Sequence, residues 1–513
     1  MKKIFKVLLS LGIILGSSFS LYADHHEGDH DDSVTEVTAD ADADHSMHAD
    51  DDHHEEAHHL PAAWSVAPFV LLLLMIATGP LFFEHFWHKY YPVVAILLGL
   101  SVIGYYTISL HDTDSVIHSL AEYVQFIALL SGLFVASGGI MINVDKEGKP
   151  FTNVVLLVIG AVLANIVGTT GASMLLIRPF IRLNKDRIKA YHIIFFIFMV
   201  SNVGGALTPI GDPPLFLGFL KGVPFAWTVV HDFVPWVFAI TILAAVFFVF
   251  DSKNKSDYDG TPNTYTGKIS ITGGKNFIWI ALVIGAVFLD PNVFSWVPSI
   301  DVELHHQMVK ISYLREIIML SIACLSYFFA NPEALKGNEF EFEPIKEVAF
   351  IFIGIFFTMI PALQLVGAFA KTPEGSEMIS INTLYWFTGA LSGVLDNAPT
   401  YVNFLTAAIS VEGGDIGMLS DVKDYAAGAE RLGGKESILN LTAISIASVF
   451  FGAMTYIGNA PNFMVKSIAE QVGVKMPAFV QYVVKYSLPI LLPILLLVWV
   501  VFIYFDLLGI MFR

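Results

Sequence analysis

The chain has 513 residues, of which 55% are hydrophobic and 14% are charged, and its formal net charge is −18. Charged residues make up about 25% of a typical soluble domain, so this composition excludes a soluble globular protein and indicates a helical membrane protein. The one cysteine, Cys324, lies in an apolar segment and can form no intrachain disulfide.

Residues 1–23 have the parts of a secretory signal peptide, namely a start with three lysines, a short apolar core over 7–15 and a cleavage-site-like sequence at 21–23. We expect this segment to be removed, and an uncleaved first helix is the alternative. Either interpretation places the following residues outside the cytoplasm.

Residues 24–60 form an acidic tail with 14 Asp or Glu, nine His and no Lys or Arg. With so few apolar residues the tail cannot bury a core, so we expect it to be disordered and extracytoplasmic. Imidazole and carboxylate groups bind divalent metals, so the tail is either a metal or proton buffer or a solvating low-complexity segment. The metal ligands would include His53, His54, His58 and His59.

Apolar windows follow, most of them near the roughly 20 residues that span a bilayer. A polar linker at 251–275, which we expect to be cytoplasmic, separates a first repeat over 61–250 from a second over 276–513. The windows are Ala62–Phe83, Tyr91–Leu110, Glu122–Ile142, Phe151–Ile181, His192–Leu220, Ala226–Phe250, Asn276–Leu289, Tyr313–Ala330, Glu347–Val366, Leu384–Ser410, Leu439–Val465 and Tyr486–Phe505.

The fourth window of each half is too long for one straight span and has polar residues at its centre. This pattern indicates a re-entrant hairpin, in which two short helices enter and leave on the same side of the membrane. A hairpin adds no crossing, so each half crosses an odd number of times and the second repeat is inverted. The excess of Lys and Arg in the loops that this topology places inside supports it. We therefore predict an all-α polytopic membrane protein with two inverted repeats, each with a re-entrant hairpin and a broken transmembrane helix.

The pattern Thr-x-Ile-Gly-(Asp or Asn)-x-Pro occurs at 208–214 and again at 455–461. The halves also align where Gly160–Asn165 matches Ser392–Asn397 and where Phe126-Ile127 matches Phe350-Ile351. A polar, helix-breaking motif repeated in two halves is typical of secondary transporters, whose substrates bind at breaks in paired membrane helices.

Four polar breaks interrupt the apolar windows, at 165–170 and 396–400 in the hairpins and at 202–214 and 455–462 in the broken helices. Free backbone groups are costly in hydrocarbon and are tolerated around a cavity or a ligand. Unwound carbonyls suit cations, whereas half-helix N-termini suit anions. The helix-breaking residues are Gly204, Gly205, Pro209, Gly211, Pro399, Gly458 and Pro461.

Two of the breaks contain a carboxylate, Asp212 and Asp396. A buried aspartate takes up a proton or pairs with a cation, so it can exchange one for the other. The alternatives are that Asp396 only caps a hairpin helix, that Asp212 solvates a turn near the interface, and that the neutral residues only satisfy freed backbone groups. The neutral ligands for a cation would be Asn165, Thr169, Asn202, Thr208, Asn397, Thr400, Thr455 and Asn459.

The stretch Ser201–Asp212 and the element Asp396–Thr400 resemble the ion-transporter superfamily, which includes NhaD-type sodium/proton antiporters, citrate and dicarboxylate carriers and arsenite permeases. The NhaD type is the most similar, and the resemblance covers residues 60–513. It implies two inverted repeats, paired hairpins, a homodimer and an elevator-like motion. The chain departs from the NhaD type at Ala164-Asn165, where Asp-Asn is usual, and at Pro213-Pro214, where threonines are usual.

The leading hypothesis is a sodium (or lithium)/proton antiporter in a bacterial-type cytoplasmic membrane, with the lipid bilayer as its surroundings. We expect no cofactor beyond the transported Na⁺ and H⁺, and no nucleic-acid partner. The main alternative is a sodium- or proton-coupled symporter of a di- or tricarboxylate such as citrate, and arsenite export is a weaker third case.

A different class would be a metal-homeostasis protein in which the His/Asp-rich tail is the working part. An enzyme is not expected, because the sequence contains no nucleotide-binding glycine loop and no catalytic Ser/His constellation.

Overall fold

The computed structural model describes residues 60–254, 267–289, 291, 294, 296–304 and 307–511. The expected signal peptide, the tail with its four candidate metal-binding histidines and part of the linker lie outside the described residues. The chain divides into two units, Met1–Val66 and Ala67–Arg513. The described part of the first unit contains a 3-10 turn, Ala63–Val66.

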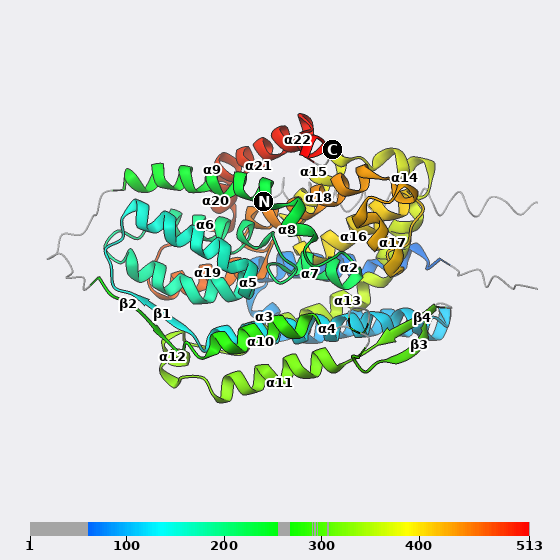
Figure 1. Cartoon of the computed structure of the whole chain (residues 1–513), viewed down its shortest axis with the longest axis horizontal. Helices are drawn as coiled ribbons and strands as arrows, with labels where there is room; N and C mark the ends of the chain where they lie inside the picture. The colour runs from blue at the N-terminus through cyan, green and yellow to red at the C-terminus, as the bar shows by residue number, and fades with distance from the viewer. Residues whose placement is uncertain are drawn as a thin grey trace, which may run out of the picture. The chain divides into compact units, whose positions relative to one another are not determined.

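The first half of the larger unit is helical, and α3 continues as a π-helical turn to Leu110 (Figure 1). Its helices are α2 (Ala67–Phe82), α3 (Glu84–Gly104), α4 (Thr113–Gly138), α5 (Pro150–Leu183), α6 (Ala190–Met199), α7 (Pro213–Lys221), α8 (Trp227–His231) and α9 (Phe233–Ser252).

The second half is helical as well, and α20 and α21 belong to one continuous run, Phe479–Tyr504. Its helices are α10 (Asn276–Val287), α11 (Leu314–Phe328), α12 (Pro332–Gly337), α13 (Glu343–Ala370), α14 (Pro373–Met378), α15 (Ile381–Ser392), α16 (Asn397–Val411), α17 (Leu419–Ala427), α18 (Lys435–Phe451), α19 (Ala460–Gln471), α20 (Phe479–Tyr482), α21 (Leu492–Trp499) and α22 (Leu507–Met511).

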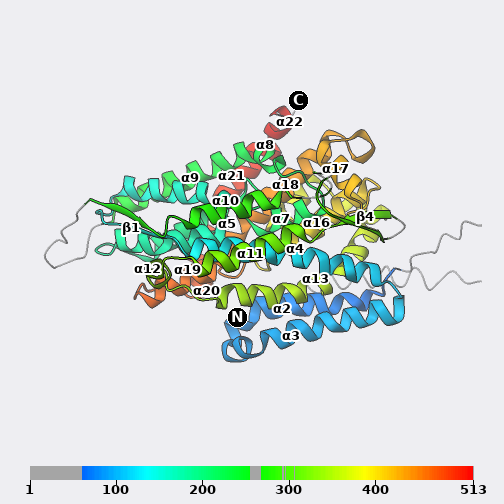
Figure 2. The same cartoon turned by 60° about the horizontal axis from the view of Figure 1, so that its bottom comes forward.

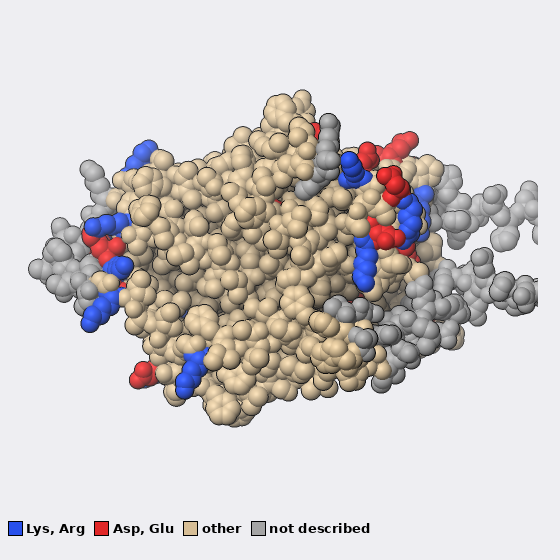
Figure 3. Space-filling model, viewed as in Figure 1, with Lys and Arg blue, Asp and Glu red and all other residues tan. Residues whose placement is uncertain are grey.

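Within the described residues, eight helices are long and apolar enough to cross a membrane. Large apolar side chains are exposed along them, for example Leu97 at 61% and Val162 at 48%. On the face shown in Figure 3, the charged side chains gather at the two ends of the long helices and leave the surface between them uncharged. This distribution fits a lipid-facing belt, and the prediction of an all-α polytopic membrane protein is confirmed.

Two short antiparallel strand pairs were not predicted. β1 (Met141–Val144) pairs with β2 (Ile269–Thr272), with Met141 opposite Thr272, and β2 lies in the segment expected to be a plain linker. β3 (Ile300–Leu304) pairs with β4 (Gln307–Ile311). These segments are too short to give a clear sequence signal, although β2 alternates Ile with Ser and Thr, residues compatible with a strand.

The helices of the larger unit form two groups, which Figures 1 and 2 show from two directions. In the scaffold group, α4 packs against α10, α11 and α13, and α3 packs against α2 and α13. In the hairpin group, α5 packs against α6, α9 and α19, and α16 packs against α7, α15 and α18. The groups meet where α4 packs against α5 and where α13 packs against α16. The third long element of each half therefore supports the hairpin of its own half.

The third elements of the two halves also pack against each other. The rings of Phe126 on α4 and Phe352 on α13 stack with centroids 4.6 Å apart. The hydroxyl of Ser119 donates to the carbonyl of Phe356 at 2.8 Å. The scaffold group is therefore built around equivalent elements of the two halves.

Candidate functional site

α5 is a hairpin rather than one straight helix. Its backbone leaves the helical region at Gly168, where φ is 80° and ψ is 155°, a conformation that favours glycine. Asn153 near its start and Asn184 just after its end exchange two side-chain hydrogen bonds of 2.7 and 2.8 Å. A straight helix would hold these residues roughly 45 Å apart, so the chain reverses at Gly168.

α15 and α16 form a second hairpin, which turns at Gly393–Asp396. α16 begins at Asn397, so Pro399 lies in the first turn of a helix, where its missing N–H leaves no intrahelical bond unmade. Pro461 likewise lies at the second position of α19. Both prolines therefore lie in the first turn of the helix that follows a break, and both breaks end sooner than expected.

The sequence match paired Asn165 with Asn397, but the structure places them differently. Asn165 comes before the reversal at Gly168, whereas Asn397 comes directly after the second turn. Counted from the reversal, Thr169 is the residue of the first hairpin that corresponds to Asn397.

The two broken helices fold through the same turn. The first break runs from the end of α6 to the start of α7 and contains Pro209, and the second runs from α18 to α19. In the first, Oγ1 of Thr208 accepts a hydrogen bond from the N–H of Gly211 at 3.1 Å. In the second, Oγ1 of Thr455 accepts one from the N–H of Gly458, also at 3.1 Å. Both threonines thus bind backbone groups here.

Glycine is required in both turns because backbone segments approach each other closely. A Cβ on Gly211 would collide with the carbonyl oxygen of Gly205, and a Cβ on Gly458 would lie 2.6 Å from that of Gly452. Gly204 is packed in the same way, with a Cβ position 2.5 Å from the carbonyl oxygen of Met199. The repeated motif therefore specifies a compact backbone as well as polar groups.

The two turns and the two hairpins meet at Asp212, which is 1% exposed. Nδ2 of Asn459, from the other broken helix, donates to its Oδ1 at 2.8 Å. Oγ1 of Thr169, from the first hairpin, donates to Oδ1 at 2.7 Å, and Nδ2 of Asn397, from the second, donates to Oδ2 at 2.6 Å. Within the described residues, the three hydrogen-bond partners of this carboxylate are all neutral and come from three different breaks.

Asn165 fixes the backbone of the first break. Its Nδ2 donates to the carbonyl of Gly204 at 2.6 Å, and its Oδ1 accepts from the N–H of Leu207 at 2.8 Å. Its own carbonyl accepts from the hydroxyl of Thr208. In this arrangement Asn165 satisfies freed backbone groups, which was the alternative to its role as a ligand.

Asn202 joins the two breaks through a residue that was not among the candidate ligands, Asn462. Nδ2 of Asn202 donates to Oδ1 of Asn462 at 2.6 Å, and Asn462 in turn donates to the carbonyls of Gly452 and Thr455. Oδ1 of Asn202 has no hydrogen-bond partner among the described residues. Asn462 lies directly after the second motif and three residues after Asn459, and this position was the signal that could have identified it.

Asp396 differs from Asp212 in its surroundings. It caps α16, because its Oδ1 accepts from the N–H of Ala398 at 3.0 Å, and its carbonyl accepts from the hydroxyl of Thr400 at 2.9 Å. Asp396 is partly exposed, whereas Asp212 is buried. The two acids share no hydrogen-bond partner in the described part of the chain.

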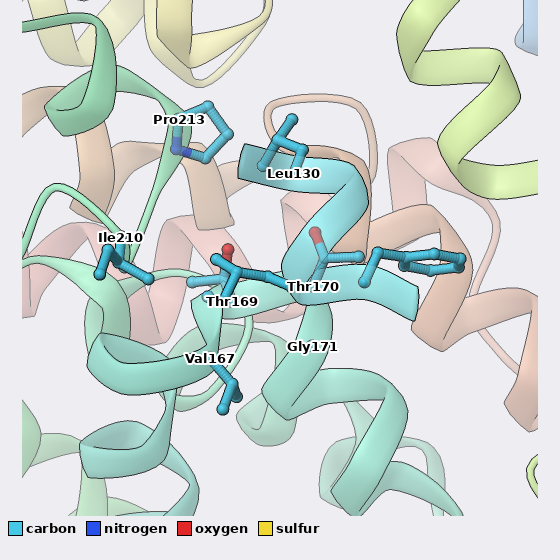
Figure 4. Close-up of a pocket in the computed structure, with 11 residues that line it drawn as sticks. Leu130, Val167, Thr169, Thr170, Gly171, Ile210 and Pro213 are labelled. Atoms are coloured by element: carbon cyan, nitrogen blue, oxygen red, sulfur yellow. The ribbon is translucent and has the colours of Figure 1, made fainter. Parts of the chain in front are cut away.

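A cavity of about 30 Å³ lies at the tip of the first hairpin, between α4 and the first break. Figure 4 shows Thr169 and Thr170 at this tip, with Ile210 and Pro213 of the first break near them. The two residues that flank Asp212 line the cavity, which has room for at least one water molecule. Its lining is Leu130, Leu133, Phe134, Val167, Gly168, Thr169, Thr170, Gly171, Ile210, Gly211 and Pro213.

Comparison with known proteins gives one family match and no match to a curated protein. The family is described as "Putative citrate transport", and its model matches residues 57–503. The match covers both halves, both hairpins and both broken helices. The chain therefore belongs to this citrate-transport family, whose members are secondary transporters of the citrate-transporter type.

Proposed function

We propose that the chain is a sodium (or lithium)/proton antiporter that exchanges the cation and the proton at Asp212. The observation behind this proposal is a buried carboxylate at the meeting point of four breaks, held by Thr169, Asn397 and Asn459. An ionised carboxylate in such a place needs a positive charge, and its three partners supply none. A proton or a metal cation can supply it, and the two compete for the same oxygens.

The neighbouring amides give the cation further ligands. Asn397 and Asn459 now donate their NH₂ groups to Asp212, and each carries an amide oxygen on the same carbon. If either side-chain amide rotates by about 180°, its oxygen replaces its NH₂ group on the side that faces Asp212. A neutral oxygen is the type of ligand that hard cations prefer. Oδ1 of Asn202, which has no hydrogen-bond partner within the described residues, lies nearby, since Gly452 packs against both Asn202 and Asn397. Proton release and cation binding would thus involve the same side chains.

Asp396 takes a second role in this proposal. It is partly exposed and lies at the turn of the second hairpin, directly before Asn397. A carboxylate in this position attracts cations toward the buried site and takes up a proton on the way. The protein would work in the cytoplasmic membrane as a homodimer, with its N-terminal tail outside.

Proton flux in everted vesicles tests the proposal. Vesicles with the protein should lose a preformed pH gradient when Na⁺ or Li⁺ is added, whereas K⁺ should have little effect. Vesicles with an equal amount of Asp212→Asn serve as the control. Gradients that persist with every cation, from neutral to alkaline pH, would contradict the antiporter.

The second candidate is a sodium- or proton-coupled symporter of a di- or tricarboxylate, which the description of the family favours. Two contacts argue against it. Asp396 already accepts the N–H of Ala398 at the N-terminus of α16, and the N–H of Thr169 donates to the carbonyl of Gly211 at 2.8 Å. At each tip, one half-helix amide that could otherwise bind an anion is thus engaged within the protein.

Calorimetry separates the two candidates. The antiporter should bind Na⁺ without citrate and show no citrate-dependent heat. Citrate or succinate binding that appears only with Na⁺ would favour the symporter.

A further inference from the structure

The buried acids of the described chain fall into three classes according to their partners. In the first class a cation lies beside the carboxylate: Lys221 is 2.8 Å from Glu122, Arg187 is 2.8 Å from Asp251, and Arg315 is 2.8 Å from Glu316. In the second, Asp212 accepts hydrogen bonds from three neutral donors. In the third, Asp232 is 0% exposed, and neither of its carboxylate oxygens has a hydrogen-bond partner within the described residues.

Asp232 lies between α8 and α9, and its backbone is fully used by these helices. Its N–H donates to the carbonyl of Thr228 at 2.8 Å, and its carbonyl accepts from the N–H of Trp236 at 2.9 Å. The side chain makes no cap to the start of α9. The backbone N–H and C=O of Asp232 are therefore hydrogen-bonded, and within the described residues only its carboxyl oxygens have no hydrogen-bond partner.

The helical turns on both sides of Asp232 contact the first break. Four residues before it, the hydroxyl of Thr228 donates to the carbonyl of Leu207 at 2.9 Å. Four residues after it, Nε1 of Trp236 donates to the carbonyl of Gly204 at 3.1 Å. Asp232 thus lies in the hairpin group, on the segment that holds the unwound backbone leading to Asp212.

The titratable neighbours of Asp232 do not neutralise it. Tyr401 on α16 lies within electrostatic range and is neutral under ordinary conditions. The ring of His231 stacks on Trp227 at 4.2 Å, and its Nδ1 lies 2.7 Å from the carbonyl of Trp227, so it is engaged on α8. Electrostatic compensation from the described surroundings is therefore lacking.

An ionised carboxylate without partners is unfavourable in such a place, because nothing replaces the water that would solvate its charge. Hard cations take several oxygen ligands, and the carboxylate oxygens of Asp232 have no hydrogen-bond partner within the described residues. A proton needs the carboxyl group alone. We infer that Asp232 is a second proton-binding group of the transport cycle, protonated in the conformation seen here and deprotonated when movement of the first break gives it water. This inference rests on the proposed antiport function and gives the cycle a proton site apart from Asp212.

Difference infrared spectroscopy tests the protonated state directly. The purified wild type should show the C=O stretch of a buried protonated carboxyl group, and this band should be lost in Asp232→Asn. It should remain in Glu374→Gln, which removes an exposed carboxylate. Spectra of wild type and Asp232→Asn without this difference would overturn the inference. Asp232→Leu, which also has no charge to bury, replaces Asp232→Asn if the latter does not fold.

Calorimetry in buffers of different ionisation enthalpy tests whether the proton takes part in exchange. It counts the protons released for each Na⁺ bound. In Asp232→Asn this number should fall by up to about one, with Na⁺ affinity changed less than about threefold. An unchanged number would overturn the role of Asp232 in the cycle. A wild type that releases no proton on adding Na⁺ would overturn the antiport function itself, and the two failures are therefore distinct.

Discussion

The two broken helices share a backbone turn and differ in charge. Thr208 and Thr455 make the same hydrogen bond to the glycine three residues later. At the next position the first break has Asp212 and the second has Asn459, and their side chains are joined by a hydrogen bond of 2.8 Å. The repeat thus supplies a symmetric frame, and one substitution within it confines the buried charge to a single copy.

The difference has a chemical consequence. Two ionised aspartates in contact would repel each other, so the pair would hold a shared proton. Releasing this proton to make room for a cation would cost more free energy than releasing it from a single aspartate. An asparagine opposite an aspartate instead donates a hydrogen bond to the ionised form and keeps an oxygen for a cation. Substitutions that alter the backbone should therefore lower the stability of the protein by similar amounts in the two breaks. Substitutions at positions 212 and 459, where the breaks differ in charge, should affect transport by different amounts.

The largest expected effect comes from Asp212→Asn. Removal of the charge that holds the cation costs about 3 kcal/mol or more, so Na⁺-dependent proton flux in vesicles should fall about 100-fold or more. The change at the matching position of the other break, Asn459→Ala, removes a neutral donor to Asp212 and to the carbonyl of Ser201, and it should reduce the flux only several-fold. Similar losses in the two variants would show that the charge at 212 has no special role.

Moving the charge across the contact sharpens the comparison. The double variant Asp212→Asn with Asn459→Asp keeps one acid and one amide in direct contact. It should recover about a tenth or more of the wild-type flux, because the two changes are coupled. Flux as low as in Asp212→Asn alone would mean that the surroundings, and not only the pair, are asymmetric.

Changes in the backbone should act alike in both halves. Gly211→Ala and Gly458→Ala each place a Cβ against a carbonyl oxygen, and each should lower the stability by ~1–3 kcal/mol. Thermal unfolding in detergent measures this. Gly285→Ala is the matched control, since its Cβ would meet nothing within 4 Å. A large difference between the first two variants would contradict a shared turn.

The smallest effects are expected at the hairpin tips. Thr169→Val and Asn397→Ala each remove one hydrogen bond to Asp212, worth ~1 kcal/mol. Each should change the apparent KM for Na⁺ by a factor of about 3–10 in vesicle assays. If either change leaves the KM as it is, the corresponding tip does not take part in binding.

The class of the fold could be predicted from the sequence because hydrophobic length is a local property. The reversal in α5 followed from a window too long to span once, and the turn at Thr208 followed from a repeated motif. The strands could not be predicted in the same way, because β1 and β2 depend on a pairing between distant loops.

The site was predictable in part. The motif identified Asp212 and Asn459, but the pattern could not show that Asn165 is engaged by the backbone or that Asp396 is partly exposed. Asp232 lies inside the predicted window Ala226–Phe250 but was not among the candidates, because it belongs to neither copy of the repeated motif. Its burial depends on tertiary packing of α8 and α9, which a single sequence does not display.

The central claim is that Na⁺ and H⁺ compete for the carboxylate of Asp212. The most direct test is the affinity of the purified protein for Na⁺, measured by calorimetry over a range of pH. For wild type, the affinity should fall as the pH falls, and Asp212→Asn should show no measurable Na⁺ binding at any pH. An affinity that does not depend on pH, or one retained in Asp212→Asn, would contradict the claim.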